Sequence, residues 1–417
     1  MKKRVCVIGN FSGRNAGDAA ILGCLLEDVS AELGECRFTI PTINKKFVRR
    51  GYGKFDIEPV GLLPQDFSLK IFGLPIFRAV LSADLVLVTD AILFDYRLLN
   101  PLFNYLSTMA LVLPLARQRG IPVVLYNVSL GPVHSGLGKA CLARVVNASS
   151  LVMLRDRQSN AVLEDLPGLR VHGAVHQTAD CALNAVPSSP ARLAEIARRE
   201  GILGGDRPWI SFNINSYLDV YVRGNRGKGI RQADFTGLVA AALDRFIDRE
   251  GINVVLVITQ PMDSRINEEM LAKVRNRDRI RIVTNREFSY QDLTAVFSAV
   301  QMHFGMRTHS LILASSVETP VVALIATPKN RGYMRSIEQD EQMVEFPDLT
   351  VESLYRSLEE TWTRREAIRA ELGPIIRREK GKARGAARLL KKHLAEEWRP
   401  NPLSSRRPLA TDFRRGG

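Results

Sequence analysis

The stretch "RVCVIGNFSGRNAGDAAILGCL", residues 4–25, passes from a short apolar strand pattern through a turn into a helical pattern. The turn contains three glycines spaced four residues apart, Gly9, Gly13 and Gly17. Because glycine permits positive φ and close backbone approach, such a turn can wrap an anion or admit a second domain. It has neither the ending of a Walker loop nor the glycine spacing of the Rossmann fingerprint. A plain strand-to-helix turn with Asp18 as a helix cap is the competing interpretation.

The alternation of strand and helix patterns repeats along the rest of the chain. Helical patterns at residues 21–34, 158–166, 235–251 and 290–300 separate apolar runs that are typical of buried strands. Repeated βα units predict parallel sheets covered by helices on both faces. The predicted strands are residues 4–9, 36–41, 83–89, 122–129, 150–156, 208–214, 253–259, 279–284, 302–306 and 320–326.

The length of the chain, 417 residues, suits about two domains, each large enough for its own core. The stretch "AVPSSPARLAE", residues 185–195, has the composition of a linker. We therefore expect an α/β protein with two doubly wound, Rossmann-like domains facing a cleft. The expected divisions are an N-terminal domain (1–187), a C-terminal domain (188–345), basic C-terminal helices (346–398) interrupted at Gly373-Pro374, and a disordered tail (399–417).

The composition is that of a globular protein, with 46% hydrophobic and 24% charged residues. Five scattered cysteines without a CxxC pair favour a reducing, cytoplasmic compartment and argue against zinc. The first apolar run ends at Gly9, too early for a signal peptide. Residues 98–116 carry no charge over a length that could cross a bilayer, but the prolines and asparagines within them favour a buried helix between two strands. Peripheral contact of this segment with a membrane is the alternative.

The net charge of +14 is concentrated at the C-terminal end. Residues 351–417 contain 17 Lys/Arg and 9 Asp/Glu, and this difference accounts for +8 of the total. A basic tail can bind nucleic acid or anionic lipid. Since the sequence has no recognised nucleic-acid module, we expect no nucleic acid partner. Anionic lipid is then the expected partner of the tail, through peripheral contact with the inner face of the membrane.

Among the predicted strand ends, residues 304–320, "FGMRTHSLILASSVETP", contain the strongest candidates for binding and catalytic side chains. Ligands of such sheets bind beyond the carboxyl ends of the strands, where Arg307 and His309 precede a helix. A guanidinium, an imidazole and a helix N-terminus together suit a multiply charged anion with a titratable group beside it. Lys329 and Arg331 follow the next predicted strand and add positive charge.

A set of motifs in one order resembles the polysaccharide pyruvyltransferase family over about residues 4–340. The set begins with Asn-x-Gly-Asp after the first strand and ends with Arg-x-His before a helix of small residues, followed by a lysine. Any one motif would be weak, but the order and spacing together are specific. The matching positions are Asn15, Gly17 and Asp18; "SLGPV" (129–133); "LRDRQS" (154–159); Asp180; Gln260 and Asp263; Arg307 and His309; and Lys329.

The resemblance implies a two-domain fold like that of B-type glycosyltransferases (GT-B). It also implies transfer of a pyruvyl group from phosphoenolpyruvate to sugar hydroxyls of a polysaccharide, glycan or lipid-linked precursor, which forms a ketal and releases phosphate. No cofactor and no metal are expected. The implied roles are proton transfer by His309, phosphoenolpyruvate binding by Arg307 with further anion contacts from Arg155 and Lys329, and an acceptor side formed by Asn15, Gly17, Asp18 and Asp95.

One segment departs from the family pattern. The family usually has Gly-Gly-Gly-x-x-x-Asp at a strand end, whereas this chain has Thr89, Asp90 and Ala91, and only Asp95 matches. Side chains there would fill space that a glycine turn leaves open. Two alternative functions stay open. The two-domain cleft also suits a glycosyltransferase that uses a nucleotide sugar, with Glu318 as the candidate for ribose. The missing glycines and the basic tail suit a non-catalytic family member in glycan assembly.

Overall fold

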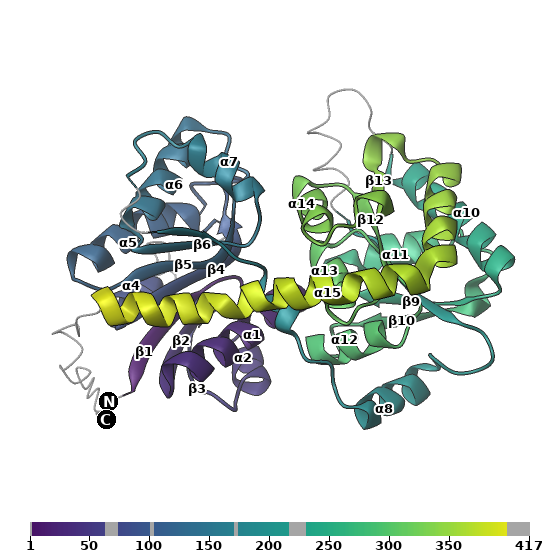
Figure 1. Cartoon of the computed structure of the whole chain (residues 1–417), viewed down its shortest axis with the longest axis horizontal. Coiled ribbons are helices and arrows are strands. Elements are labelled where there is room, and N and C mark those ends of the chain that lie inside the picture. The colour runs from purple at the N-terminus through teal and green to yellow at the C-terminus, as the bar shows by residue number, and fades with distance from the viewer. Residues whose placement is uncertain (1, 63–73, 101–103, 171–173, 217–230, 398–417) are drawn as a thin grey trace, which may run out of the picture.

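The computed structural model describes residues 2–62, 74–100, 104–170, 174–216 and 231–397, and every structural statement below concerns these residues. The chain forms two α/β domains, each built on one parallel sheet, that lie side by side along the long axis of the molecule (Figure 1). A long C-terminal helix, α15 (Val351–Glu397), runs across both domains. The predicted fold class is therefore confirmed.

The N-terminal domain contains a seven-stranded sheet in the order β3-β2-β1-β4-β5-β6-β7. Because β1 lies at the centre with β2 on one side and β4 on the other, the chain winds outward in both directions. The strands are β1 (Lys3–Ile8), β2 (Cys36–Thr42), β3 (Asp56–Gly61), β4 (Leu85–Leu93), β5 (Val123–Leu130), β6 (Leu151–Leu154) and β7 (Val175–Gln177). The helices are α1 (Ala16–Leu33), α2 (Lys45–Gly51), α4 (Leu74–Leu81), α5 (Leu106–Gln118), α6 (Gly136–Ala148) and α7 (Gln158–Glu164).

The C-terminal domain repeats this plan with a six-stranded sheet in the order β10-β9-β8-β11-β12-β13. A short 3-10 turn, η1 (Cys181–Asn184), and helix α8 (Pro190–Glu200) lead into it from the N-terminal domain. The strands are β8 (Trp209–Asn213), β9 (Asn253–Ile258), β10 (Ile280–Thr284), β11 (His303–Gly305), β12 (Val321–Ile325) and β13 (Met343–Glu345). The remaining helices are α10 (Gln232–Glu250), α11 (Ser264–Leu271), α12 (Tyr290–Ser298), α13 (Thr308–Ser316) and α14 (Pro328–Ser336).

Alternate side chains of each strand enter the cores on the two faces of the N-terminal sheet. Val5 and Val7 of β1 belong to a core that also contains residues of α1 and α15. Cys6 and Ile8 belong to a second core, with residues of α4, α5 and α6. Helices α1 and α15 therefore cover one face of the sheet, and α4, α5 and α6 cover the opposite face.

Helix α15 corrects the prediction of separate C-terminal helices. It continues through the predicted break, because Pro374 lies inside the helix. Leu372 and Ile376 on either side of that proline are buried in the core that α15 shares with α1. This packing holds the segment helical despite the backbone hydrogen bond that proline cannot make. The predicted disordered tail, residues 399–417, lies outside the described residues.

Two further corrections concern three strands that the sequence analysis missed and a linker that it made too long. Strands β3, β7 and β13 were not predicted, and all three lie at sheet edges, where side chains are only partly buried. The predicted linker at 185–195 is also too long. Helix α8 begins at Pro190 inside it, with Ser189 as the N-cap, because serine followed by proline favours a helix start.

The uncharged segment 98–116 contains a helix between two strands, as predicted, but the helix begins only at Leu106. It is not wholly buried, because Leu111 and Leu115 are exposed. Residues 101–103 of the segment lie outside the described residues. Among the helices that the structure describes, none is both long enough and apolar enough to span a membrane.

Candidate functional site

The carboxyl edge of the N-terminal sheet meets the C-terminal domain through direct contacts. The backbone N–H of Ala16, at the start of α1, donates to the carbonyl oxygen of Thr259 at 2.9 Å, just beyond β9. The side chain of Gln158, at the start of α7, donates to the carbonyl oxygen of Pro328 at the start of α14. Since these are strand ends and helix N-termini, the two domains bring together the positions where α/β sheets bind ligands.

The glycine-rich turn places the start of α1 against the other domain. Asn15 caps the helix, because its Oδ1 accepts from the backbone N–H of Gly17 at 2.9 Å. A Cβ atom on Gly17 would lie only 2.0 Å from Cγ of His309. The first turn of α1 can therefore meet His309 only because residue 17 has no side chain. The interpretation of Asp18 as the helix cap is wrong, since Asn15 takes that role.

Arg307 and His309 lie at the N-terminus of α13, directly after β11. Arg307 occupies the N-cap position, and its side chain makes no capping bond to the helix. Helix starts expose N–H groups and a partial positive charge, which favour an anion. The ring of His309 is largely buried, and its Nε2 lies 3.7 Å from a carboxylate oxygen of Asp180, in the other domain.

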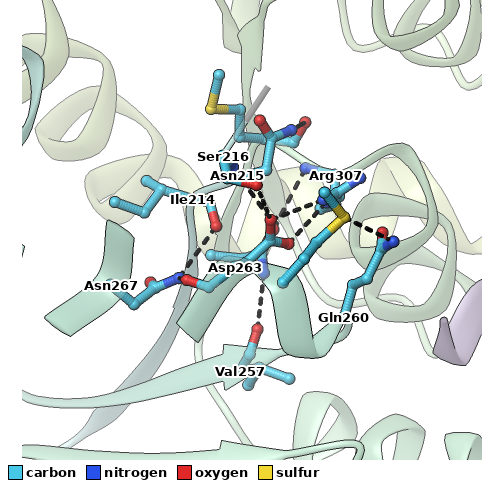
Figure 2. A network of polar contacts seen from close by, with 11 residues as sticks. Ile214, Asn215, Ser216, Val257, Gln260, Asp263, Asn267 and Arg307 are labelled. Atoms are coloured by element: carbon cyan, nitrogen blue, oxygen red, sulfur yellow. Dashed lines mark hydrogen bonds and ion pairs between the residues drawn. The ribbon is translucent and has the colours of Figure 1, made fainter. Parts of the chain in front are cut away.

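The guanidinium of Arg307 is held by Asp263, at the start of α11 (Figure 2). Nε and Nη2 of Arg307 donate to the two carboxylate oxygens at 2.8 and 2.6 Å. Asp263 is fully buried and also accepts from the backbone N–H and the hydroxyl of Ser216, at 3.0 and 3.1 Å. This bidentate geometry fixes the plane of the guanidinium. The sequence motif contained Asp263, but nothing in the sequence paired it with Arg307.

Arg155, which follows β6, faces this site from the N-terminal domain. Its Nη1 lies 2.7 Å from Oδ2 of Asp180, and its Nη2 lies 3.9 Å from Oδ1 of Asp90. All three side chains are almost completely buried. Burial by itself would raise the pKa of Asp180, but the charge of Arg155 and the contact with His309 outweigh it and lower the pKa to about 2.

Asp18 and Asp90 add two buried carboxyl groups to the same site. Asp18, in the first turn of α1, is 4% exposed and accepts a hydrogen bond from Nδ2 of Asn10 at 2.9 Å. Its pKa lies well above the ordinary value, first because of burial and then because of the charge of Asp90. Asp90 lies in β4 with φ of 70°, in the left-handed region that glycine prefers. The segment thus keeps a glycine-like backbone at residue 90 while adding a carboxylate.

Lys329 lies in the first turn of α14, in the C-terminal domain. Burial and, secondly, the charge of Arg155 lower the pKa of its ammonium group to about 8, while the carboxylates of Asp90 and Asp18 oppose that shift. These electrostatic partners belong to the N-terminal domain. Lys329 therefore lies close enough to Arg155 for the two charges to interact, and their roles as anion-binding groups stay a prediction. Arg331, by contrast, forms a bidentate ion pair with Glu345.

Several buried polar atoms in this site have no well-aligned hydrogen bond within the described residues. They are Oγ1 of Thr89, Nη1 of Arg155, Oδ2 of Asp180 and Nε2 of His309. Three of these atoms face one another as ion pairs, because Oδ2 of Asp180 lies 2.7 Å from Nη1 of Arg155 and 3.7 Å from Nε2 of His309. We call the group formed by Asp18, Asp90, Arg155, Asp180, Arg307, His309 and Lys329 the interdomain polar site.

Asp95, predicted on the acceptor side, makes its described hydrogen bonds with the turn before α6. Its Oδ2 accepts from the backbone N–H groups of His134 and Ser135 at 2.8 and 2.7 Å, which fixes the turn before α6. Partial burial would raise its pKa, but these backbone hydrogen bonds lower it below the ordinary value. The described contacts of Asp95 serve the loop 131–135 and do not include the interdomain polar site.

Glu318, the candidate ribose ligand, lies beyond the C-terminal end of α13, whereas Arg307 and His309 lie at its N-terminal end. A helix of nine residues is about 13 Å long, so Glu318 is far from the site. Its carboxylate lies 3.5 Å from Nη1 of Arg377 in α15. The role suggested for Glu318 is therefore wrong. Within the described ranges, no group of three or more His, Cys, Asp or Glu side chains could hold a metal ion.

The family model described as "Polysaccharide pyruvyl transferase" matches residues 15–326, which is most of the chain. The chain belongs to this family. The matched range contains Asn15 at the start of α1, Arg155, Asp180, Asp263, and the Arg307 and His309 pair. It ends just before Lys329, and α15 lies outside it. Among curated proteins, none matches the sequence.

Solved structures of glycosyltransferases and epimerases have a similar fold. HepE of Anabaena in complex with UDP-glucose superposes with a TM-score of 0.62 at 14% identity, over 94% of this chain and 100% of that chain. The UDP-GlcNAc 2-epimerase of Methanocaldococcus jannaschii gives 0.61 at 11% identity, with coverages of 94% and 100%. The sucrose-phosphate synthase of Thermosynechococcus elongatus gives 0.56 at 13% identity, with coverages of 95% and 99%. At these identities the similarity establishes the GT-B-like fold alone.

Proposed function

We propose that this protein transfers a pyruvyl group from phosphoenolpyruvate to two hydroxyls of a sugar and so forms a cyclic ketal. The sugar belongs to an exopolysaccharide or cell-envelope glycan, or to its lipid-linked precursor in the cytoplasm. The observation that carries the proposal is the meeting of His309 and Arg307, at the start of α13, with Gly17, Arg155 and Asp180 of the other domain. Family membership over residues 15–326 supports a transferase acting in polysaccharide synthesis.

The charge pattern of the site suits phosphoenolpyruvate, which carries a phosphate and a carboxylate. Asp263 fixes the orientation of the Arg307 guanidinium at the start of α13, because Nε and Nη2 donate to its two carboxylate oxygens. In this proposal Arg307 and the N-terminus of α13 hold the donor from the C-terminal domain. Lys329, in the same domain, adds a second cationic group, and Arg155 contacts the donor from the opposite side of the cleft.

The reaction needs balanced proton transfers. One proton is added to the methylene carbon of phosphoenolpyruvate, and another leaves with the phosphate group. The two sugar hydroxyls supply both protons as their oxygens bond to the former enol carbon. We assign proton transfer to His309, whose ring lies against α1 with Nε2 3.7 Å from a carboxylate oxygen of Asp180.

The acceptor side of the proposed site is formed by the start of α1 and by β4. In this proposal Asp18 binds sugar hydroxyls, whereas the Asn15 side chain is already used as the helix cap. The raised pKa of Asp18 favours its protonated form, which can donate as well as accept a hydrogen bond. Gly17 contributes by the close approach that it permits.

A nucleotide-sugar glycosyltransferase is the second candidate, because HepE, with a similar fold, was solved in complex with UDP-glucose. The discriminating test measures thermal stabilisation of the purified protein by phosphoenolpyruvate, UDP, GDP and CMP. Ligand at about one hundred times its dissociation constant adds about 2.7 kcal/mol of stability. We expect stabilisation by phosphoenolpyruvate only, and its loss in Arg307→Ala. Stabilisation by a nucleotide instead would favour the second candidate, and no response would favour a non-catalytic role.

Catalysis is tested by phosphate release from phosphoenolpyruvate in the presence of glycan acceptors. We expect His309→Asn to lower the turnover rate about 10²- to 10⁴-fold with little effect on donor binding, because general acid-base groups contribute factors of this size. His176, on β7, provides the matched control as His176→Asn. Normal phosphate release by His309→Asn would refute the assignment. The contact of the basic C-terminal region with an anionic membrane that the sequence predicts does not depend on this chemistry, and it is compared below with a second surface.

A further inference from the structure

The N-terminal domain exposes large apolar side chains on α5, on α6 and in the loop after β4. Leu99 is 77% exposed, Leu111 is 58% exposed and Leu137 is 55% exposed, and Tyr96 and Leu115 are also exposed. Single exposed leucines are common on protein surfaces, but a group on adjoining elements marks a surface for contact with another molecule. We call the side chains of Tyr96, Leu99, Leu111, Leu115 and Leu137 the apolar surface.

The members of the apolar surface are close neighbours in the fold. Helices α5 and α6 pack against each other, and Leu99 and Leu137 line one hollow of about 630 Å³. Leu111 and Leu115 are four residues apart, so they lie on the same side of α5. Leu99 and Leu137 therefore form one exposed pair and Leu111 and Leu115 a second, on helices that pack against each other.

The charged side chains on α5 and α6 are all basic, and the acidic groups beside them are Asp95, which packs on Gly138, and Asp165, which pairs with Lys139. Neither α5 nor α6 contains an aspartate or a glutamate. Arg117 and Arg144 line a second hollow between the later turns of these helices. Arg97 lies within the loop, where its guanidinium is 5.3 Å from the centre of the Tyr96 ring. Exposed leucines bordered by arginine, without acidic residues on the same helices, fit the boundary between the acyl chains and the anionic headgroups of a bilayer.

We infer that the apolar surface docks this protein on an anionic lipid bilayer. The surface begins just after β4, the strand that carries Asp90 in the interdomain polar site. A sugar on a lipid anchor could thus reach the cleft while its acyl chain stays in the bilayer. The idea that the acceptor is lipid-linked rests on the proposed function. Docking on lipid does not, because it requires no pyruvyl transfer.

The basic face of α15 is the competing membrane surface. Residues 377–392 contain eight Lys/Arg and one Glu, which gives +7 from 8 − 1, and the glutamate, Glu379, is buried. However, α15 covers the opposite face of the N-terminal sheet from α5 and α6. One flat bilayer cannot contact both faces at once, so the two surfaces make different predictions.

The test is co-sedimentation of the full chain with vesicles of phosphatidylcholine, with and without 30% phosphatidylglycerol. We expect binding to the anionic vesicles and a decrease of about tenfold or more in the triple variant Leu111→Gln, Leu115→Gln, Leu137→Gln. The matched control, Val186→Gln, Met262→Gln, Ile282→Gln, replaces exposed apolar side chains elsewhere and should bind normally. Equal binding by the two triple variants would overturn the inference.

Two further measurements separate the alternatives. Charge reversal on α15 (Arg384→Glu, Arg388→Glu, Lys392→Glu) should weaken binding much less than the leucine variant, and the opposite ranking would assign docking to α15 and overturn the inference. Tryptophan in Leu111→Trp should be quenched by brominated acyl chains, whereas that in Ile282→Trp should not. Absence of quenching, or a dimer that dissociates in the leucine variant, would assign the surface to another contact. Phosphate release with a soluble acceptor, unaffected in the leucine variant, tests the proposed function separately.

Discussion

Arg307 and Arg155 face the interdomain polar site from different domains, and their surroundings differ. Arg307 makes a bidentate, well-aligned pair with Asp263, which Ser216 also holds. Arg155 is near two carboxylates, at 2.7 and 3.9 Å, and its Nη1 makes no well-aligned hydrogen bond within the described residues. The C-terminal half of the site therefore presents an arginine preorganised by one bidentate partner, whereas the arginine of the N-terminal half is shared between two carboxylates.

Of the substitutions that test this difference between the two arginines, Asp263→Asn should change the free energy of unfolding most. Replacing the buried partner of Arg307 should lower the free energy of unfolding by about 3 kcal/mol, because it leaves a largely buried guanidinium poorly paired. It should also abolish stabilisation by phosphoenolpyruvate. Urea unfolding provides the measurement. Asp234→Asn, in an exposed pair with Arg231, is the control and should leave stability nearly unchanged. Equal stabilities for Asp263→Asn and wild type would contradict the preorganised arrangement.

The next largest effect is the loss of folding stability at low pH that protonation of Asp180 should cause. Its pKa is about 2 in the folded state and about 3.9 when unfolded, so its stabilising contribution is present above pH 4 and disappears as the pH falls towards 2. The difference corresponds to about 2.5 kcal/mol. Unfolding of wild type and Asp180→Asn, measured between pH 5 and pH 2, should show that the variant loses less stability over this interval. Parallel pH profiles would show that Asp180 is not held in its charged form.

A smaller effect is expected for Gly17→Ala, which tests the contact between the two halves. The added Cβ would meet the ring of His309, so the domains must separate locally, at a cost of about 2 kcal/mol. Thermal unfolding and phosphate release should both be impaired. Gly51→Ala is a matched control, because a Cβ on Gly51 has no neighbour within 4 Å. If Gly17→Ala behaved like Gly51→Ala, the contact between α1 and His309 would not constrain the site.

The smallest effect on stability is expected for Asp90→Gly. Relief of the positive φ and loss of a buried charge should change the unfolding free energy by less than about 1 kcal/mol in either direction. The informative measurement is the carboxyl titration of Asp18 by NMR, where the pKa should fall but stay above its ordinary value, because burial is the larger cause of its shift. Asp90→Asn, which removes the charge without relieving φ, should give the same fall. An unchanged pKa in both variants would show that the two carboxyl groups do not interact.

The interior strands of both sheets could be predicted from the sequence, because strands that are buried on both faces need continuous apolar runs. The edge strands β3, β7 and β13 were missed, since half-exposed strands need no continuous apolar run. Arg307, His309 and Arg155 were proposed from their positions just after predicted strands, and the structure places all three at the contact between the domains. The ion pair of Arg307 with Asp263 joins residues 44 positions apart, and no local pattern could predict it.

The sequence by itself determined the α/β class, the family and the residue types of the site, because apolar periodicity and motif order are local properties. The tertiary structure alone decided which residues meet across the domains. Only folding places Gly17 against His309, turns α15 back onto the N-terminal sheet and leaves Asp95 to fix a loop. The physical reason is that burial and ion pairing depend on distances in space, and residues far apart along the chain set those distances.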